Sequence, residues 1–224
     1  MRFKLLLLPL VLALAACGGG DDESASTAGG DAAAESSATV PGECQTVDAP
    51  AAKADGGQEA PEPVLVAGKT YSLVFQTSCG PFTVKLDAKS APKAAASLVS
   101  LTKAGFYDGT TFHRVVPGFV IQGGDPTGTG TGGPGYTTVD APPIGTIYTE
   151  GVVAMAKGGA DPAGTGGSQF FIVTAPDAGL PPEYAVVGTV TKGMETVSAI
   201  EALGTGDGPP SQPVVIEKVT VEES

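Results

Sequence analysis

Short apolar or alternating segments of four to six residues recur between residues 71 and 219, which leaves little room for a fold that is not mainly β. Segments of this length, bounded by glycine, proline and serine, are typical of strands. The first two alternate apolar and polar residues on either side of Ser78-Cys79-Gly80-Pro81, which predicts a β-hairpin. The six clearest strands are expected at 71–76, 82–86, 152–156, 170–173, 185–190 and 214–219.

Two stretches predict helices. In 91–104, Pro92 falls in the first turn, and Ala94, Leu98 and Leu101 share one face. Gly105 follows, where a helix commonly ends. The second helix is expected at 194–203. Many short strands with only two helices favour a closed barrel capped at its ends.

Residues 1–16 are typical of a bacterial export leader. Arg2 and Lys4 precede an apolar run, 5–14, that is too short to span a bilayer comfortably. The run ends in Leu14-Ala15-Ala16-Cys17, which resembles a lipobox and predicts lipidation of Cys17. The alternative is an ordinary secretory signal cut after a small residue. The first interpretation predicts an exported protein that is lipid-anchored to the outer face of the cytoplasmic membrane or to a periplasmic leaflet.

Residues 17–63 are rich in Gly, Ala, Ser and acidic side chains and have few large apolar ones, which predicts a disordered tether before a domain at 64–224. Residues 18–63 carry ten acidic side chains against Lys53 alone, and residues 64–224 carry fourteen against nine basic ones. Nucleic-acid binding needs clustered Lys and Arg, so this charge pattern excludes it as a function. Contact with a membrane is expected only through the lipid.

Lipidation of Cys17 leaves Cys44 and Cys79. An exported chain occupies an oxidising compartment, so a disulfide between them is expected, closing a loop of about 35 residues. The alternative is two unpaired thiols, and their spacing does not match a Cys-x-x-Cys redox pair.

Two further stretches, 112–125 and 166–172, carry the chemistry of the domain. Arg114 is the only arginine once the leader is removed. Gln169 and Phe171 are two residues apart, so on a strand they share a face. Phe119 and Gln122 are three apart, so a bend or bulge near Gly123-Gly124 is needed to bring them together.

These stretches, together with Met155-Ala156, resemble the signature segments of cyclophilins, the cyclosporin-type peptidyl-prolyl cis-trans isomerases. The resemblance covers about residues 70–221. It implies a closed eight-stranded antiparallel β-barrel capped by two helices, and an enzyme that isomerises Xaa-Pro bonds of exported proteins without cofactor or metal. A monomer that binds proline-containing polypeptides is expected.

By this resemblance, Arg114 donates a hydrogen bond to the prolyl nitrogen and is steered by Gln122. The proline pocket would comprise Phe119, Val120, Phe171 and Leu180, with Tyr184 beside it; Ala156, Lys157 and Gln169 would hold the peptide backbone. The sequence departs from the best-known members in three places: Tyr184 stands where many have a histidine, Lys157 replaces a common asparagine, and tryptophan is absent, with Gly179 nearest its place. We therefore expect weak cyclosporin binding.

Two alternatives to the isomerase stay open at this stage. A proline-peptide-binding holdase would keep the groove without turnover, and a redox or surface-structural lipoprotein would use only Cys44 and Cys79. Gly128-x-Gly130-x-x-Gly133 formally matches a dinucleotide fingerprint, but Pro134-Gly135 prevents the helix that such a site needs.

His113, the only histidine, is expected on the strand face opposite Arg114 and is assigned a structural role.

Overall fold

The computed structural model describes residues 42–62 and 65–224. The expected leader and Cys17 lie outside these residues. Within them, no helix combines the length and apolar character that crossing a bilayer requires.

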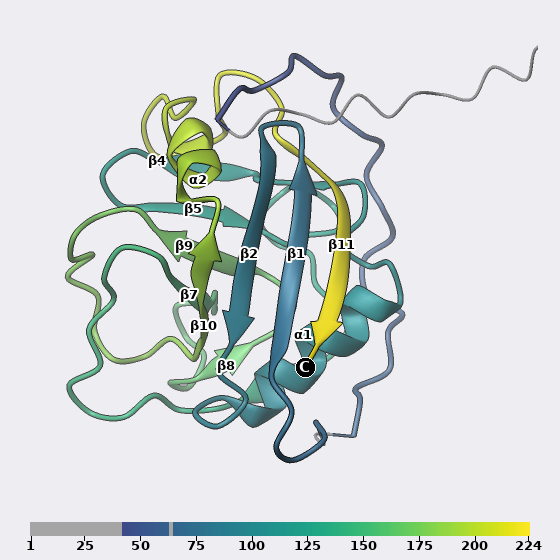
Figure 1. Ribbon diagram of the computed structural model, residues 1–224, viewed down its shortest axis with the longest axis vertical. Helices are drawn as coiled ribbons and strands as arrows, with labels where there is room; N and C mark the ends of the chain where they lie inside the picture. Colours follow the sequence, from purple (N-terminus) through teal and green to yellow (C-terminus); the bar gives the residue numbers. More distant parts are fainter. Residues whose placement is uncertain (1–41, 63–64) are drawn as a thin grey trace, which may run out of the picture. The chain divides into compact units, whose positions relative to one another are not determined.

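Antiparallel strands form a curled nine-stranded sheet in the order β3-β11-β1-β2-β10-β7-β9-β5-β4, and β6 and β8 form a separate pair (Figure 1). The strands are β1 (Tyr71–Thr77), β2 (Gly80–Leu86), β3 (Thr110–Thr111), β4 (Arg114–Val116), β5 (Val120–Gly123), β6 (Thr138–Val139), β7 (Val152–Met155), β8 (Thr165–Gly166), β9 (Phe170–Val173), β10 (Val186–Lys192) and β11 (Val215–Glu223). All six strands expected from the sequence are present.

The predicted hairpin is β1–β2, and its alternation sets which side chains face inward. Leu73 and Phe75 on β1 are buried, and Phe75 lies opposite Phe82 on β2 with the rings stacked 4.6 Å apart. Gly80 and Pro81, expected in the turn, belong to β2, so the turn itself is Ser78 and Cys79.

The expected closed eight-stranded barrel differs from the observed half-barrel of nine strands. β3 and β4 follow each other in the chain, yet they lie at the two ends of the strand order. Among residues 65–224, no ladder joins these two strands. One isolated bridge connects Thr111 of β3 with Asp125, which follows β5. β3 and β4 are only two and three residues long, so they offer few backbone groups for a ladder that would close the sheet.

The two helices lie at opposite ends of the sheet, α1 (Pro92–Lys103) beside β11 and α2 (Met194–Glu201) near β4 (Figure 1). The apolar face of α1, including Ala94, Leu98 and Leu101, is buried as its spacing predicts. Its N-terminus is capped from a distant loop, because the backbone N–H of Ala94 donates to the Asp140 carboxylate at 2.7 Å. α2 ends two residues earlier than expected.

Strand pleating divides the apolar side chains between two clusters. Ile121 on β5 and Ile172 on β9 face the main core inside the curled sheet. Their neighbours Val120 and Phe171 face the other way into a second cluster that also contains Tyr148, Ala154, Val173 and Ala175. This second cluster forms the floor of the site described below.

Residues 42–62 contain no helix or strand, yet they hydrogen-bond to the domain along their length. Gln45 N–H donates to the Ser78 carbonyl at 2.7 Å, and Gln58 N–H donates to the Pro134 carbonyl at 3.0 Å. Cys44 and Cys79 form a disulfide with an S–S distance of 2.01 Å. Composition predicted a tether here because these contacts use backbone groups, polar side chains and one disulfide, none of which requires large apolar side chains.

Candidate functional site

Arg114 and Gln122 face each other across the β4–β5 ladder, which fixes the central polar pair of the site. Their Cα atoms are register partners, and Arg114 Nη1 donates to Gln122 Oε1 at 3.3 Å. The turn between the strands, closed by Phe119 N–H to Val116 O at 3.0 Å, brings the Phe119 ring beneath the guanidinium, 6.0 Å from its carbon. The bend that unites Phe119 with Gln122 is therefore this turn, in which Gly118 has φ +70°, and not Gly123-Gly124.

A cavity of about 190 Å³, here called the aromatic cavity, opens beside this pair. Its floor is the second apolar cluster, and its rim carries one guanidinium and one amide. It is lined by Arg114, Phe119, Val120, Gln122, Ala156, Lys157, Phe171, Leu180 and Tyr184. The structure thus brings nine of the ten substrate-site residues expected from the resemblance to one place.

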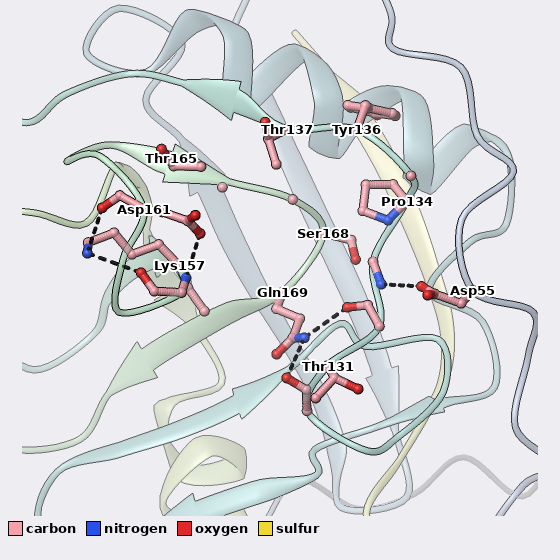
Figure 2. A pocket seen from close by; sticks show the side chains of 18 of the residues that line it. Asp55, Thr131, Pro134, Tyr136, Thr137, Lys157, Asp161, Thr165, Ser168 and Gln169 are labelled. Carbon is pink, nitrogen blue, oxygen red and sulfur yellow. Dashed lines mark hydrogen bonds between the residues drawn. The ribbon is translucent and has the colours of Figure 1, made fainter.

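Gln169, the tenth, lies in a larger neighbouring cavity of about 800 Å³, here called the glycine-loop cavity (Figure 2). The two cavities share Gln122, Ala156 and Lys157. Gln169 Nε2 donates to the carbonyls of Gly130 and Gly132 at 3.0 and 2.9 Å, and its Oε1 accepts from Gln122 Nε2 at 3.0 Å. A continuous hydrogen-bond chain therefore runs from the glycine loop through both glutamines to Arg114.

Asp207, which no sequence motif singles out, orients Arg114 from the side opposite Gln122. Arg114 Nε and Nη2 donate to the two Asp207 carboxylate oxygens at 2.5 and 3.1 Å. The hydrogen bond from Arg114 holds the pKa of Asp207 below its usual value. With Nη1 on Gln122, every nitrogen of the guanidinium has a partner, so the plane of the group is fixed over the cavity.

Replacing Asp207 with alanine is expected to lower kcat/KM for a prolyl peptide by about 3- to 10-fold. The reason is that the guanidinium loses the two hydrogen bonds to the carboxylate that fix the orientation of its plane. Thermal stability should change little, since the carboxylate is exposed. Glu217→Ala, at an exposed acid on β11, is the control. Equal activities of the two variants would show that Asp207 does not position Arg114.

Lys157 contributes to the cavity wall without offering a free charge. Its side chain is 4% exposed, and Nζ pairs with Glu183 at 3.1 Å and donates to the carbonyls of Gly158 and Asp161. The ammonium also lies 5.7 Å from the centre of the Tyr184 ring. A substrate can therefore meet the backbone of Lys157 but not an unpaired cation.

Tyr148 is a second residue that sequence reasoning missed, and it fixes Tyr184 in place. Its fully buried hydroxyl donates to the Tyr184 carbonyl at 2.8 Å and accepts from the Tyr184 N–H at 3.0 Å. Burial raises the pKa of Tyr148, so the phenol stays neutral. The rings of Phe171 and Tyr184 pack edge to face, 5.4 Å apart, which completes one wall of the aromatic cavity.

His113 does not line either cavity. Neither ring nitrogen, both buried, has a hydrogen-bond partner among the described residues. Burial, reinforced by Arg114 and opposed by Asp125, lowers the pKa of His113. This placement fits a structural role.

The free energy of unfolding should fall as the pH drops below about 6.5, the ordinary pKa of histidine. The folded-state pKa of His113 is lower than the unfolded one, so the unfolded chain binds more protons in this range and is favoured. The thermal midpoint should drop more between pH 7.5 and 5.5 in the parent than in His113→Gln. Parallel pH profiles would contradict this assignment.

Residues 72–221 match the family described as cyclophilin type peptidyl-prolyl cis-trans isomerase/CLD. A relative from Gibberella zeae, peptidyl-prolyl cis-trans isomerase-like 1, is 36% identical over 160 residues, covering 69% of this chain and 97% of its own. Peptidyl-prolyl cis-trans isomerase B of Bacillus subtilis is 50% identical over 113 residues, covering 50% of this chain and 76% of its own.

Solved structures agree with this match. The crystal structure of a cyclophilin type peptidyl-prolyl cis-trans isomerase from Cryptosporidium parvum superposes with a TM-score of 0.63 at 32% identity, covering 68% of this chain and 98% of that one. The same protein in the presence of the dipeptide Ala-Pro gives a TM-score of 0.62. The chain belongs to the family of cyclophilin-type peptidyl-prolyl cis-trans isomerases, enzymes of class EC 5.2.1.8.

Proposed function

We propose that this protein accelerates Xaa-Pro isomerisation in exported polypeptides, with Arg114 as the donor to the prolyl nitrogen and the aromatic cavity as the proline pocket. The observation that carries the proposal is the placement of one fully oriented guanidinium at the rim of a small cavity floored by apolar side chains. A proline ring is apolar and compact, and it fits the chemistry of such a floor. The Cryptosporidium parvum relative, whose structure was determined with Ala-Pro, supports the same ligand class.

The reaction requires neither a nucleophile nor a proton acceptor. The barrier of about 18 to 20 kcal/mol comes from amide resonance, which places the nitrogen lone pair in the π system. As the bond twists, that lone pair localises on nitrogen and can accept a hydrogen bond. Shortening a step of about 100 s to about 10 ms requires roughly 5 kcal/mol of transition-state stabilisation. A preoriented charged donor and tighter binding of the twisted state can supply it.

The peptide on either side of the proline would lie between the two cavities. Ala156 and Lys157 border both cavities, and Gln169 lines the glycine-loop cavity beside them. These three residues are placed to hold the peptide backbone while the ring is kept still. Gln122 contacts both Arg114 and Gln169, which couples the donor to the peptide-holding side.

Export and lipid anchoring belong to the same proposal. They rest on the leader pattern of residues 1–16 and on Cys17 at its end. The Cys44–Cys79 disulfide is a feature of oxidising compartments and supports an extracytoplasmic location. The protein would act as a monomer, reaching the membrane only through the lipid, and it would bind neither nucleic acid nor a cofactor.

The alternative function is a holdase that binds proline-containing chains without turnover. The two are separated by adding the full chain, at one-twentieth of the substrate concentration, to a protein whose refolding is limited by prolyl isomerisation. An isomerase shortens the slow phase at this ratio, because each molecule acts repeatedly. A holdase leaves the rate unchanged at this ratio, which would refute the catalytic proposal.

Cyclosporin should inhibit weakly, since the chain has no tryptophan and Gly179 is nearest the place where the resemblance puts that ring. Titration of the inhibitor in a peptide isomerisation assay checks this expectation. Inhibition at nanomolar concentrations would contradict it.

A further inference from the structure

Residues 42–62, here called the strap, lie outside the region 72–221 that matches the isomerase family. In Figure 1 the strap, the purple segment, runs over the outer side of the domain past β11 and α1. Although the strap lies outside that match, one of its residues, Asp55, lines the glycine-loop cavity (Figure 2).

Two anchors fasten the first half of the strap. The disulfide joins Cys44 to the β1–β2 turn. Lys53 then inserts its ammonium among three carbonyls, donating to Gly105 at 3.1 Å, Phe106 at 2.6 Å and Asp108 at 3.0 Å. Burial lowers the pKa of Lys53, with Asp108 opposing the change.

The second half of the strap pairs with the glycine loop, residues 126–135. The backbone N–H of Lys53 donates to the Pro126 carbonyl at 2.8 Å, and the N–H of Gly56 donates to the Gly133 carbonyl at 2.9 Å. The Asp55 carboxylate accepts from the Gly133 N–H at 2.8 Å. Both backbone groups of Gly133 are therefore held by two consecutive strap residues.

The braced loop is the one that holds Gln169. Gly132, adjacent to Gly133, offers its carbonyl to Gln169 Nε2, and Gly130 offers a second. Inside the loop, the N–H groups of Gly130 and Gly132 donate to the buried carboxylate of Asp125. The strap and Asp125 thus fix the loop from opposite sides, and the loop fixes the amide of Gln169.

We propose that the strap is a working part of the isomerase site, with Asp55 as a positioning residue that acts through Gly133 and the glycine loop on Gln169. The inference rests on the proposed function, because it assigns Gln169 to holding the peptide. Loss of the brace should weaken peptide binding in the ground and transition states alike, so the effect should appear in KM and leave kcat nearly unchanged. Arg114 variants should instead change kcat.

The test uses Asp55→Ala and Asp55→Asn in the full chain, with Glu59→Ala as the matched control. Glu59 is an exposed strap acid whose side chain has no hydrogen bond or ion pair within the described residues. Asp55→Ala should raise KM about 3- to 10-fold and shift the side-chain amide NMR signals of Gln169. Asp55→Asn keeps an oxygen acceptor for Gly133 N–H and should restore most of the binding. Glu59→Ala should leave both readouts at parent values.

Three results would overturn the proposal. KM of Asp55→Ala within twofold of the parent would make the strap a stabilising element only. A raised KM without a shift of the Gln169 signals would place the effect elsewhere, and so would an Asp55→Asn variant as impaired as Asp55→Ala. If the parent binds peptide without turnover, the proposed catalysis fails but the strap proposal does not. The Asp55→Ala, Asp55→Asn and Glu59→Ala variants are then compared with the parent by their Kd for the peptide in place of KM. If the parent binds no peptide, the strap proposal falls with the proposed function.

Discussion

Replacing Arg114 with alanine is expected to lower kcat/KM for a proline-containing peptide by about 100- to 1,000-fold, in line with the loss of one preorganised donor to developing electron density. Gln122 and Asp207 would remain, but neither can replace the charged donor, because Gln122 is a neutral amide and the Asp207 carboxylate only accepts. The loss should appear mainly in kcat, because the apolar floor of the cavity still binds the ring. Steady-state isomerisation kinetics measure it.

Arg114→Lys is the matched variant for this prediction. It keeps the positive charge but lacks the planar group whose three separate nitrogens donate to Gln122 and to the two oxygens of Asp207. Its activity should lie between those of the parent and Arg114→Ala. If Arg114→Ala kept a third or more of the parent activity while remaining folded, the guanidinium would not be the principal donor.

Removal of the disulfide should have the largest effect on stability. The double variant Cys44→Ser/Cys79→Ser should lose about 3 to 4 kcal/mol of unfolding free energy, since the bridge spans 35 residues of sequence and restricts the unfolded chain. Urea denaturation of parent and variant under non-reducing conditions measures the difference. A loss below about 1 kcal/mol would show that the bridge adds little constraint.

The same double variant addresses the redox alternative. Its isomerase activity, measured below the unfolding temperature, should stay within about threefold of the parent, because the Lys53 and Asp55 contacts still hold the strap. Abolished activity in a folded variant would support a catalytic part for the cysteines.

The spacing of apolar residues was sufficient to predict those elements whose conformation depends mainly on their own sequence. The β1–β2 hairpin and the apolar face of α1 follow from alternation and helical spacing, and both are present. The strands β3, β6 and β8, two residues each, have no period of their own and exist only through their partners. The sequence-based expectation consequently had too few strands, and it closed the barrel where the structure has an open edge between β3 and β4.

The residues of the aromatic cavity were accessible from the sequence because two dense motifs carry most of them. The supporting residues were not. Asp207, Tyr148 and Asp55 come from loops and from the strap, far along the chain from the groups they hold. Nothing in their local sequence indicates these partners, since a carboxylate or hydroxyl in a glycine-rich stretch is compatible with many contacts.

The role proposed for Arg114 is to catalyse rotation about a prolyl bond in the aromatic cavity. NMR exchange between the cis and trans forms of an Ala-Pro-Phe peptide tests this role, with saturating amounts of the full chain or of its Arg114→Ala variant. Exchange should be fast on the parent and slower by about 100-fold or more on the variant, with the peptide still bound to both. Equal exchange rates on the two proteins, or binding to the parent without accelerated exchange, would contradict it.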